Sequence, residues 1–191
     1  MDAIHSLIED LISGDEVRAE SASGHLGQMG SPAITALEAV LGSPEADHRW
    51  WAVRALAQMP EVGTDHFMIP LGDVSAEVRQ AAALALVAHP AEEAAPVLVR
   101  ALSDNDALVQ TLAANALSAL GKPAVPFLLA AYPQATLSAK IHMMRVLADA
   151  RDHRAIPLMM KAMDEDSAIL HHWCEIGLQQ LGLDMVYLQL S

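Results

Sequence analysis

Apolar and polar positions follow a helical period along this chain, most clearly over residues 75–104. In the first half of this stretch, four apolar residues recur at i, i+4, i+7 and i+8, which gives a helix one apolar face. They are Val78, Ala82, Ala85 and Leu86. We predict one helix over residues 76–88, a break at His89-Pro90, and a second helix over residues 91–102. Neither helix could bury its apolar face alone, so the pair requires neighbouring helices.

The same pair recurs along the whole chain with a period of 30 or 31 residues. One leucine marks the same point of every unit: Leu26, Leu56, Leu86, Leu117, Leu147 and Leu178. A break follows four residues later, at Gly30, Pro60, Pro90, Gly121 and Gly182, with Arg151 as the one departure. Self-similarity at this period, with two helices per unit, is typical of an α-solenoid. We therefore predict an all-α superhelix of about five to six helix pairs.

The repeated phrase resembles a known repeat type. It contains Val78-Arg79, Ala81-Ala82, Ala85-Leu86 and, after the break, Ala94-x-Pro96-x-Leu98. Weaker copies are Val109-Gln110 with Ala124-Val125-Pro126, and Ala155-Ile156-Pro157. The phrase resembles the HEAT repeat, in particular the short bacterial form named after the phycobilisome lyase subunits. The resemblance covers nearly the whole chain and implies a HEAT-repeat solenoid. Because that family includes lyases, chaperones, hydroxylases and scaffolds, it does not choose between functions.

The repeat pattern divides the chain into a cap and six repeats within a single domain, residues 1–191. Residues 2–13 are amphipathic and have no helix before them, so we predict an N-terminal capping helix. The repeats are expected at about 15–43, 47–73, 75–104, 105–133, 135–165 and 166–191. The second repeat departs most from the pattern, because Pro70 lies well inside its second helix and is expected to end or kink it near Ile69. Such an irregularity marks either a bend or a site.

Composition limits the class of protein. The chain has 53% hydrophobic residues and a mean hydropathy of +0.27, yet no run approaches the ~20 apolar residues of a membrane span. The N-terminal segment spaces its apolar residues and begins with an acid, unlike a signal peptide. The single cysteine, Cys174, excludes an internal disulfide and fits a reducing compartment. We expect a cytoplasmic protein without membrane contact.

Charge argues against a nucleic-acid partner. With 24 acidic and 11 basic residues the net charge is −13, and no lysine- or arginine-rich face of the kind that a phosphate backbone requires is present. An acidic rim is expected at Glu38, Glu92, Glu93 and Asp164. Long-range attraction to this rim would favour a neutral or basic partner.

The resemblance implies that the second helices line the concave face. Two rows, counted from Pro96, are expected to face outward there. The first row is Ala36, His66, Val97, Phe127 and Leu158, and the second is Ala39, Ile69, Arg100, Ala130 and Lys161. We predict that Ile69, Val97, Phe127 and Leu158, with Met160 beside them and Arg100 and Lys161 on the same face, receive a partner's amphipathic helix or a flat hydrophobic ligand. A register shifted by one residue would instead make them ordinary core side chains.

The tryptophans are interpreted mainly as packing residues. Trp51 and Trp173 share one repeat position and are expected to fill the core between helices. Trp50 is expected to face solvent, where it could form a contact patch with His48.

One cluster, residues 171–175, has metal-ligand chemistry. His171, Cys174 and Glu175 lie at i, i+3 and i+4 and could share a helix face suited to zinc. However, Cys174 near the core and Glu175 point partly apart, and no second cluster completes four ligands. We therefore predict a buried Cys174, surface histidines, and no metal or cofactor.

Enzymatic motifs are not found in the sequence. It contains no Gly-rich phosphate loop, nucleophile elbow or H-E-x-x-H, and no histidine is followed by the glutamate that resemblance to the iron-binding hydroxylases would require. We predict a non-enzymatic scaffold that binds a protein partner on its concave face. The alternatives are a chromophore-handling subunit like the phycobilin lyases, a chaperone, or a regulatory subunit that forms a homodimer through the apolar C-terminal stub, residues 184–190.

Overall fold

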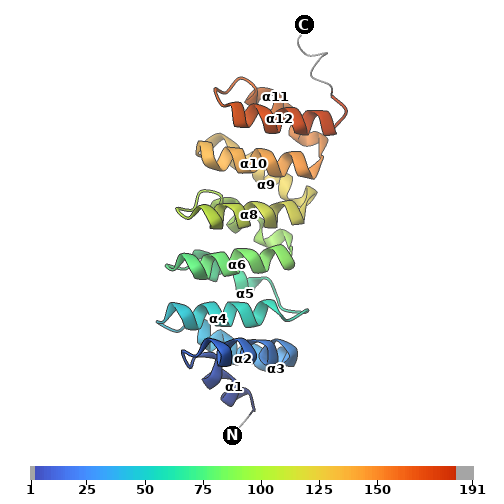
Figure 1. Ribbon diagram of the computed structural model, residues 1–191. Coiled ribbons are helices and arrows are strands. Elements are labelled where there is room, and N and C mark those ends of the chain that lie inside the picture. Colours follow the sequence, from blue (N-terminus) through green and yellow to red (C-terminus); the bar gives the residue numbers. More distant parts are fainter. Residues whose placement is uncertain (1–2, 184–191) are drawn as a thin grey trace. The chain divides into compact units, whose positions relative to one another are not determined.

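The computed structural model of the chain describes residues 3–183, which fold into helices joined by short turns (Figure 1). Within this range there are twelve α-helices, five 3-10 helices and no strand, which confirms the predicted all-α class. The chain divides into two compact units, residues 1–89 (unit 1) and residues 90–191 (unit 2). The prediction that they act as a single domain stays a prediction.

Unit 1 contains the cap, two helix pairs and the first helix of a third pair. Its elements are α1 (Ala3–Leu11), α2 (Glu16–Met29), α3 (Ser31–Leu41), α4 (Ala46–Ala57), α5 (Asp65–Met68), η1 (Pro70–Gly72) and α6 (Ala76–Ala88). The first helices of successive repeats, α2, α4 and α6, lie side by side (Figure 1). Helix α4 begins at Ala46, one residue before the second repeat was expected to start, and the predicted repeat bounds stay a prediction.

Unit 2 continues the same plan. Its elements are η2 (Glu92–Ala94), α7 (Ala95–Ala101), α8 (Ala107–Leu120), η3 (Lys122–Ala124), α9 (Val125–Ala131), η4 (Tyr132–Gln134), α10 (Leu137–Ala150), η5 (His153–Ala155), α11 (Ile156–Ala162) and α12 (Ala168–Gln180). Helices α8, α10 and α12 lie side by side (Figure 1). None of the helices described is by itself long and apolar enough to cross a bilayer; residues 107–120 and 122–134 reach that length only as a pair bent by 113°.

The repeat leucines form the core of both units. Leu26, Leu56 and Leu86 are fully buried in unit 1, and Leu117, Leu147 and Leu178 are fully buried in unit 2. Alanine is the commonest of the other buried apolar residues, and its small side chain lets two helix backbones approach closely. The spacing that predicted the repeats is thus the spacing of the buried residues.

The second helices begin differently from the prediction. Residues 91–102 were expected as one helix, but η2 forms the first turn and α7 begins only at Ala95. Pro96 lies at the start of α7, where its missing N–H interrupts no helical hydrogen bond. The same 3-10 turn precedes α9 and α11, each of which also begins with a proline.

In the second repeat, Pro70 shortens the second helix as predicted. Helix α5 has four residues and ends at Met68, after which η1 begins at Pro70. Proline cannot donate the next helical hydrogen bond and its ring crowds the preceding turn. This second helix is therefore shorter than α3 in the first repeat, and the difference leaves space beside it.

Candidate functional site

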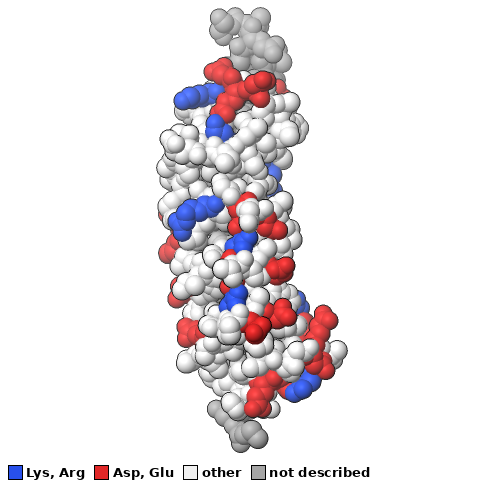
Figure 2. All heavy atoms as spheres, turned by 90° about the vertical axis from the view of Figure 1, so that its left-hand side faces the viewer, with Lys and Arg blue, Asp and Glu red and all other residues white. Residues whose placement is uncertain are grey.

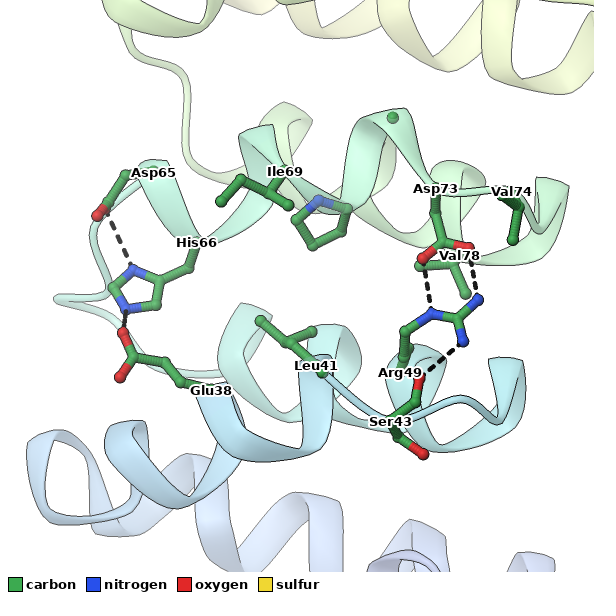
Figure 3. Close-up of a pocket in the computed structure, with 13 residues that line it drawn as sticks. Glu38, Leu41, Ser43, Arg49, Asp65, His66, Ile69, Asp73, Val74 and Val78 are labelled. Carbon is green, nitrogen blue, oxygen red and sulfur yellow. Dashed lines mark hydrogen bonds and ion pairs between the residues drawn. The ribbon is translucent and has the colours of Figure 1, made fainter.

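A cavity of about 710 Å³ lies in unit 1 where the second repeat departs from the pattern (Figure 3). One side is formed by the end of α3 and the turn that leads into α4. The other side is formed by α5, η1 and the turn before α6. The cavity lies beside the short α5, at the irregularity that the sequence identified as a bend or a site.

The middle of the cavity is apolar. Leu41 from α3 faces Ile69 across it (Figure 3), and Pro70 from η1 and Val78 from α6 also line it. Ile69 was predicted to lie at a partner-binding position, and it is 86% exposed. Val74, in the turn after η1, is 93% exposed. Two branched apolar side chains thus stand in solvent on the wall of one cavity.

One end of the cavity is closed by an ion pair. The guanidinium of Arg49 donates to both carboxylate oxygens of Asp73 over 2.7 Å, and its Nη1 donates to the carbonyl oxygens of Ser43 and Pro44 over 2.9 Å. Both side chains are 12% exposed. The hydrogen bonds between Arg49 and Asp73 lower the pKa of Asp73 and raise the pKa of Arg49. These contacts of the Arg49 side chain connect the turn before α4 to the turn before α6.

The other end carries two carboxylates around one imidazole. His66 Nε2 lies 3.1 Å from Glu38 Oε1, and Nδ1 lies 3.2 Å from Asp65 Oδ1 and 3.0 Å from the carbonyl oxygen of Gly63 (Figure 3). The side chains of Glu38 and Asp65 are 51% and 73% exposed. Glu38 was predicted as part of an acidic rim, whereas Asp65 was not.

In unit 2 the two predicted rows differ in exposure. Val97, Phe127 and Leu158 are half-buried, whereas Arg100 and Lys161 are exposed. Met160 is 37% exposed. None of these side chains is fully buried. Their predicted role in binding a partner stays a prediction.

The tryptophans differ from the prediction. Trp51 and Trp173 are half-buried and not fully enclosed, and Trp50 is half-buried where solvent exposure was expected. Trp50 is partly covered because its ring meets that of Trp51 edge to face at 4.8 Å, and the Arg54 guanidinium lies over both rings. His48 is also half-buried, with Nδ1 3.0 Å from Ser43 Oγ. A partner contact at His48 and Trp50 stays a prediction.

In the cluster at residues 171–175, Cys174 packs in the core and His171 contacts the backbone. Cys174 is buried as predicted, and burial raises the pKa of its thiol to about 12. His171 was expected at the surface, but it is half-buried and lies 2.6 Å from the carbonyl oxygen of Glu165. Within residues 3–183, no group of three or more histidine, cysteine, aspartate or glutamate residues is placed to hold a metal ion.

A polar network in unit 2 was not predicted. Glu165 accepts hydrogen bonds from Lys140 Nζ over 2.7 Å and from Tyr132 Oη over 3.1 Å. Hydrogen bonding to Lys140 lowers the pKa of Glu165, and burial raises that of Tyr132. The network joins the turn before α12 to α10, so its role is structural.

On the face drawn in Figure 2, lysine and arginine side chains lie singly and mostly beside acidic ones. The predicted acidic rim residues Glu38, Glu92, Glu93 and Asp164 are all exposed. That the chain does not bind nucleic acid stays a prediction. The homodimer predicted through residues 184–190 lies outside the described residues.

Comparison with known proteins agrees with the repeat pattern. The family model for HEAT repeats matches residues 64–139. The bilin biosynthesis protein RpcF of Synechococcus sp. (strain WH8020) is 34% identical over 76 residues, which are 40% of this chain and 36% of that protein. The chain thus spans about a third of the length of this relative.

Solved structures share the fold at low sequence identity. The archaeal HEAT-like repeats protein from Thermococcus onnurineus NA1 has a TM-score of 0.66 at 15% identity, over 95% of this chain and 81% of that one. The complex of CpcE and CpcF of phycocyanin lyase from Nostoc sp. PCC7120 has a TM-score of 0.56 at 20% identity, over 95% and 78%. A designed armadillo repeat protein in complex with peptide (KR)4 has a TM-score of 0.53 at 16% identity, over 94% and 100%. The chain therefore has the α-solenoid fold that these structures share, and residues 64–139 match the model for HEAT repeats.

Proposed function

We propose that this chain is a non-enzymatic scaffold that binds a protein partner through exposed side chains of its second helices. The observation that carries the proposal is Ile69, which is 86% exposed on the wall of the cavity in unit 1. Exposed apolar side chains gathered at a cavity are typical of binding sites. HEAT repeats support the same function, because their stacked helices present an extended binding surface.

Unit 2 offers a surface of the same kind. Val97, Phe127 and Leu158 expose part of their apolar side chains, while Arg100 and Lys161 stand in solvent on the same helices. A cytoplasmic location is part of the proposal, since the one cysteine fits a reducing compartment.

The test compares Ile69→Ser with Val17→Ser in capture of partners from a lysate of the source organism. Val17 is 80% exposed on α2 and does not line the cavity, so its substitution removes a similar apolar area elsewhere. Both variants should keep native circular dichroism because neither side chain is buried. We expect one protein to be retained by the native chain and by Val17→Ser but lost by Ile69→Ser. If the native chain and both variants capture the partner equally well, the cavity is not part of the binding site.

A second candidate function is the handling of an open-chain tetrapyrrole. It is favoured by the 34% identity with a bilin biosynthesis protein. Mixing the purified chain with biliverdin should then shift the visible absorbance of the pigment at one equivalent. An unchanged spectrum at about 100 μM of both, a range in which weak binding is still detected, would count against this candidate.

A further inference from the structure

The charges around the cavity in unit 1 determine what can enter it. Of the thirteen residues that line it, Arg49 is the one lysine or arginine. Its guanidinium already donates to Asp73 and to two carbonyl oxygens. Four of its five N–H groups are thereby used and its charge is paired with Asp73, so it attracts a ligand carboxylate or phosphate only weakly. The cavity is therefore poorly suited to an anion, including the propionates of a bilin.

The opposite end is negative for any protonation state of His66. A neutral imidazole carries one N–H, so it can donate to Glu38 or to Asp65 but not to both. The net charge of the three side chains is then −2. A protonated imidazole donates to both and leaves a net charge of −1. In either state the exposed carboxylates attract a cation.

The apolar wall and this acidic end are adjacent. His66 and Ile69 are three residues apart, on α5 and at its C-terminal cap, so their side chains project to one face at roughly 5–6 Å between Cβ atoms. In an extended peptide, residues two apart are separated by roughly 6.6 Å. A ligand that satisfies both parts therefore carries an apolar side chain and a cation about two residues apart.

We propose that the cavity binds a segment of a partner protein in which a large apolar residue stands about two positions from an arginine or lysine. The apolar side chain enters between Leu41, Ile69 and Pro70, and the cation lies against Glu38 and Asp65. The net charge of −13 speeds the approach of such a basic segment. This inference rests on the proposed scaffold function and adds the chemistry of the partner.

The probe is a library of random dodecapeptides displayed on phage and selected on the full-length chain, with Ile69→Ser as the counter-selection. We expect the enriched peptides to share a large apolar residue with arginine or lysine about two positions away. An enriched peptide is then made with a fluorescent label, and its affinity is measured by anisotropy. Enrichment of acidic peptides, or of peptides that bind Ile69→Ser equally well, would overturn the inference, as would no enrichment.

The acidic end is tested by the double variant Glu38→Gln, Asp65→Asn. At 20 mM NaCl the labelled peptide should bind it about tenfold more weakly than the native chain, and 500 mM NaCl should remove most of the difference. The matched control is Glu9→Gln, Glu20→Gln, which removes two exposed carboxylates outside the cavity. This control should lose less than about twofold, because distant surface charges are screened.

The experimental outcomes distinguish a failure of this inference from a failure of the proposed scaffold function. If Ile69→Ser loses the captured partner but the double carboxylate variant binds the partner like the native chain, the scaffold function stands and the basic segment is wrong. If sedimentation shows a dimer that Ile69→Ser abolishes, the cavity is occupied by a second copy of the chain. If biliverdin binds to the native chain but not to Ile69→Ser, the cavity is the binding site of the pigment. Either of the last two results overturns the peptide inference.

Discussion

Arg151 has a positive φ, as glycine has at the same point of other repeats, but its ψ of 49° is that of the left-handed helix. Its φ is 48°, against 66° at Gly30 and 71° at Gly121. A side chain with a Cβ atom is strained there, because Cβ approaches the following carbonyl oxygen. The sequence showed Arg151 as the one departure from the breaks at glycine or proline. The turn at Arg151 differs from the turns at Gly30 and Gly121, whose ψ angles are −140° and −135°.

We expect Arg151→Gly to be more stable than Arg151→Ala by about 1 kcal/mol. Both variants lose the hydrogen bond from Arg151 Nε to Gln180 Oε1, so their difference isolates the backbone conformation. Urea denaturation followed by circular dichroism gives the difference in midpoint. An alanine variant as stable as the glycine variant would mean that the turn has relaxed to another conformation.

Asp152, the next residue, makes part of the stability depend on pH. Hydrogen bonding to Arg154 lowers the pKa of Asp152 to about 2. A carboxylate whose pKa is depressed by folding stabilises the native state above its unfolded pKa, near 3.9, and this contribution is lost as the pH falls toward 2. For Arg154→Gln we expect a higher pKa of Asp152 and a smaller loss of stability between pH 4 and pH 2.

Carbon-13 NMR of the Asp152 carboxyl measures this pKa directly. Arg100→Gln is the control, because Arg100 is an exposed arginine on another helix of unit 2. It should leave the titration of Asp152 unchanged. An unchanged pKa of Asp152 in Arg154→Gln would assign the shift to the backbone N–H of residue 154, which also donates to the carboxylate over 2.9 Å.

Helix packing in unit 1 depends on a glycine in α2. A Cβ atom added at Gly27 would lie 2.7 Å from Gln58 Cβ at the end of α4, whereas one added at Gly24 would have its nearest neighbour, Gln58 Oε1, at 3.9 Å. We expect Gly27→Ala to destabilise the chain by about 1–3 kcal/mol, since α2 and α4 must move apart. Gly24→Ala, on the same helix, should stabilise it by about 0.5–1 kcal/mol through helix propensity. Thermal denaturation of both variants would show whether their stability depends on the close approach of α2 and α4 or on helix propensity. Similar changes in melting temperature for both variants would contradict the packing argument.

The helices could be predicted from the sequence because burial repeats with them. The six leucines that defined the period are all fully buried, and the predicted end of the second helix before Pro70 is where α5 ends. The 3-10 turns before α7, α9 and α11 were not predicted, because a 3-10 turn and an α-helical turn share the same apolar spacing over three residues. The apolar pattern therefore predicts which helix face is buried, but it does not predict whether the first turn has 3-10 or α-helical hydrogen bonds.

The candidate site was predictable only in part. Ile69 was found because its row position faces outward, but Leu41, Arg49 and Asp73 were not, since a cavity depends on how two neighbouring repeats approach. One signal was present: Arg49 lies seven residues before Leu56, and Lys140 lies at the same point before Leu147. Their partners, Asp73 and Glu165, lie thirteen residues before the next repeat leucine in each case. Repeat-aligned residues of opposite charge therefore indicate an ion pair between consecutive repeats.

Four of the six first helices also share one hydrogen bond to the turn before them. The residue seven positions before the repeat leucine contacts a backbone carbonyl oxygen six residues earlier: Arg49 with Ser43, Arg79 with Asp73, Gln110 with Asp104, and His171 with Glu165. The donor type changes from repeat to repeat while the contact is kept. This explains why the histidine of the supposed metal cluster faces the turn and not solvent.

The division of the chain into two units predicts where a local defect spreads. In a repeat protein each helix pair contacts mainly its neighbours, so destabilisation of one unit need not reach the other. Gly27→Ala should increase amide hydrogen exchange in α2 and α4 by about tenfold or more, while α10 and α12 change less than about twofold. Gly177→Ala is the reciprocal control, because its Cβ would lie 2.6 Å from Met159 Cε inside unit 2, and it should affect α10 to α12 and spare α2 and α4. Mass spectrometry of the exchanged peptides separates the two responses. An equal increase throughout the chain for either variant would show a single cooperative domain, as the repeat pattern alone predicted, and would rule out independent opening of the two units.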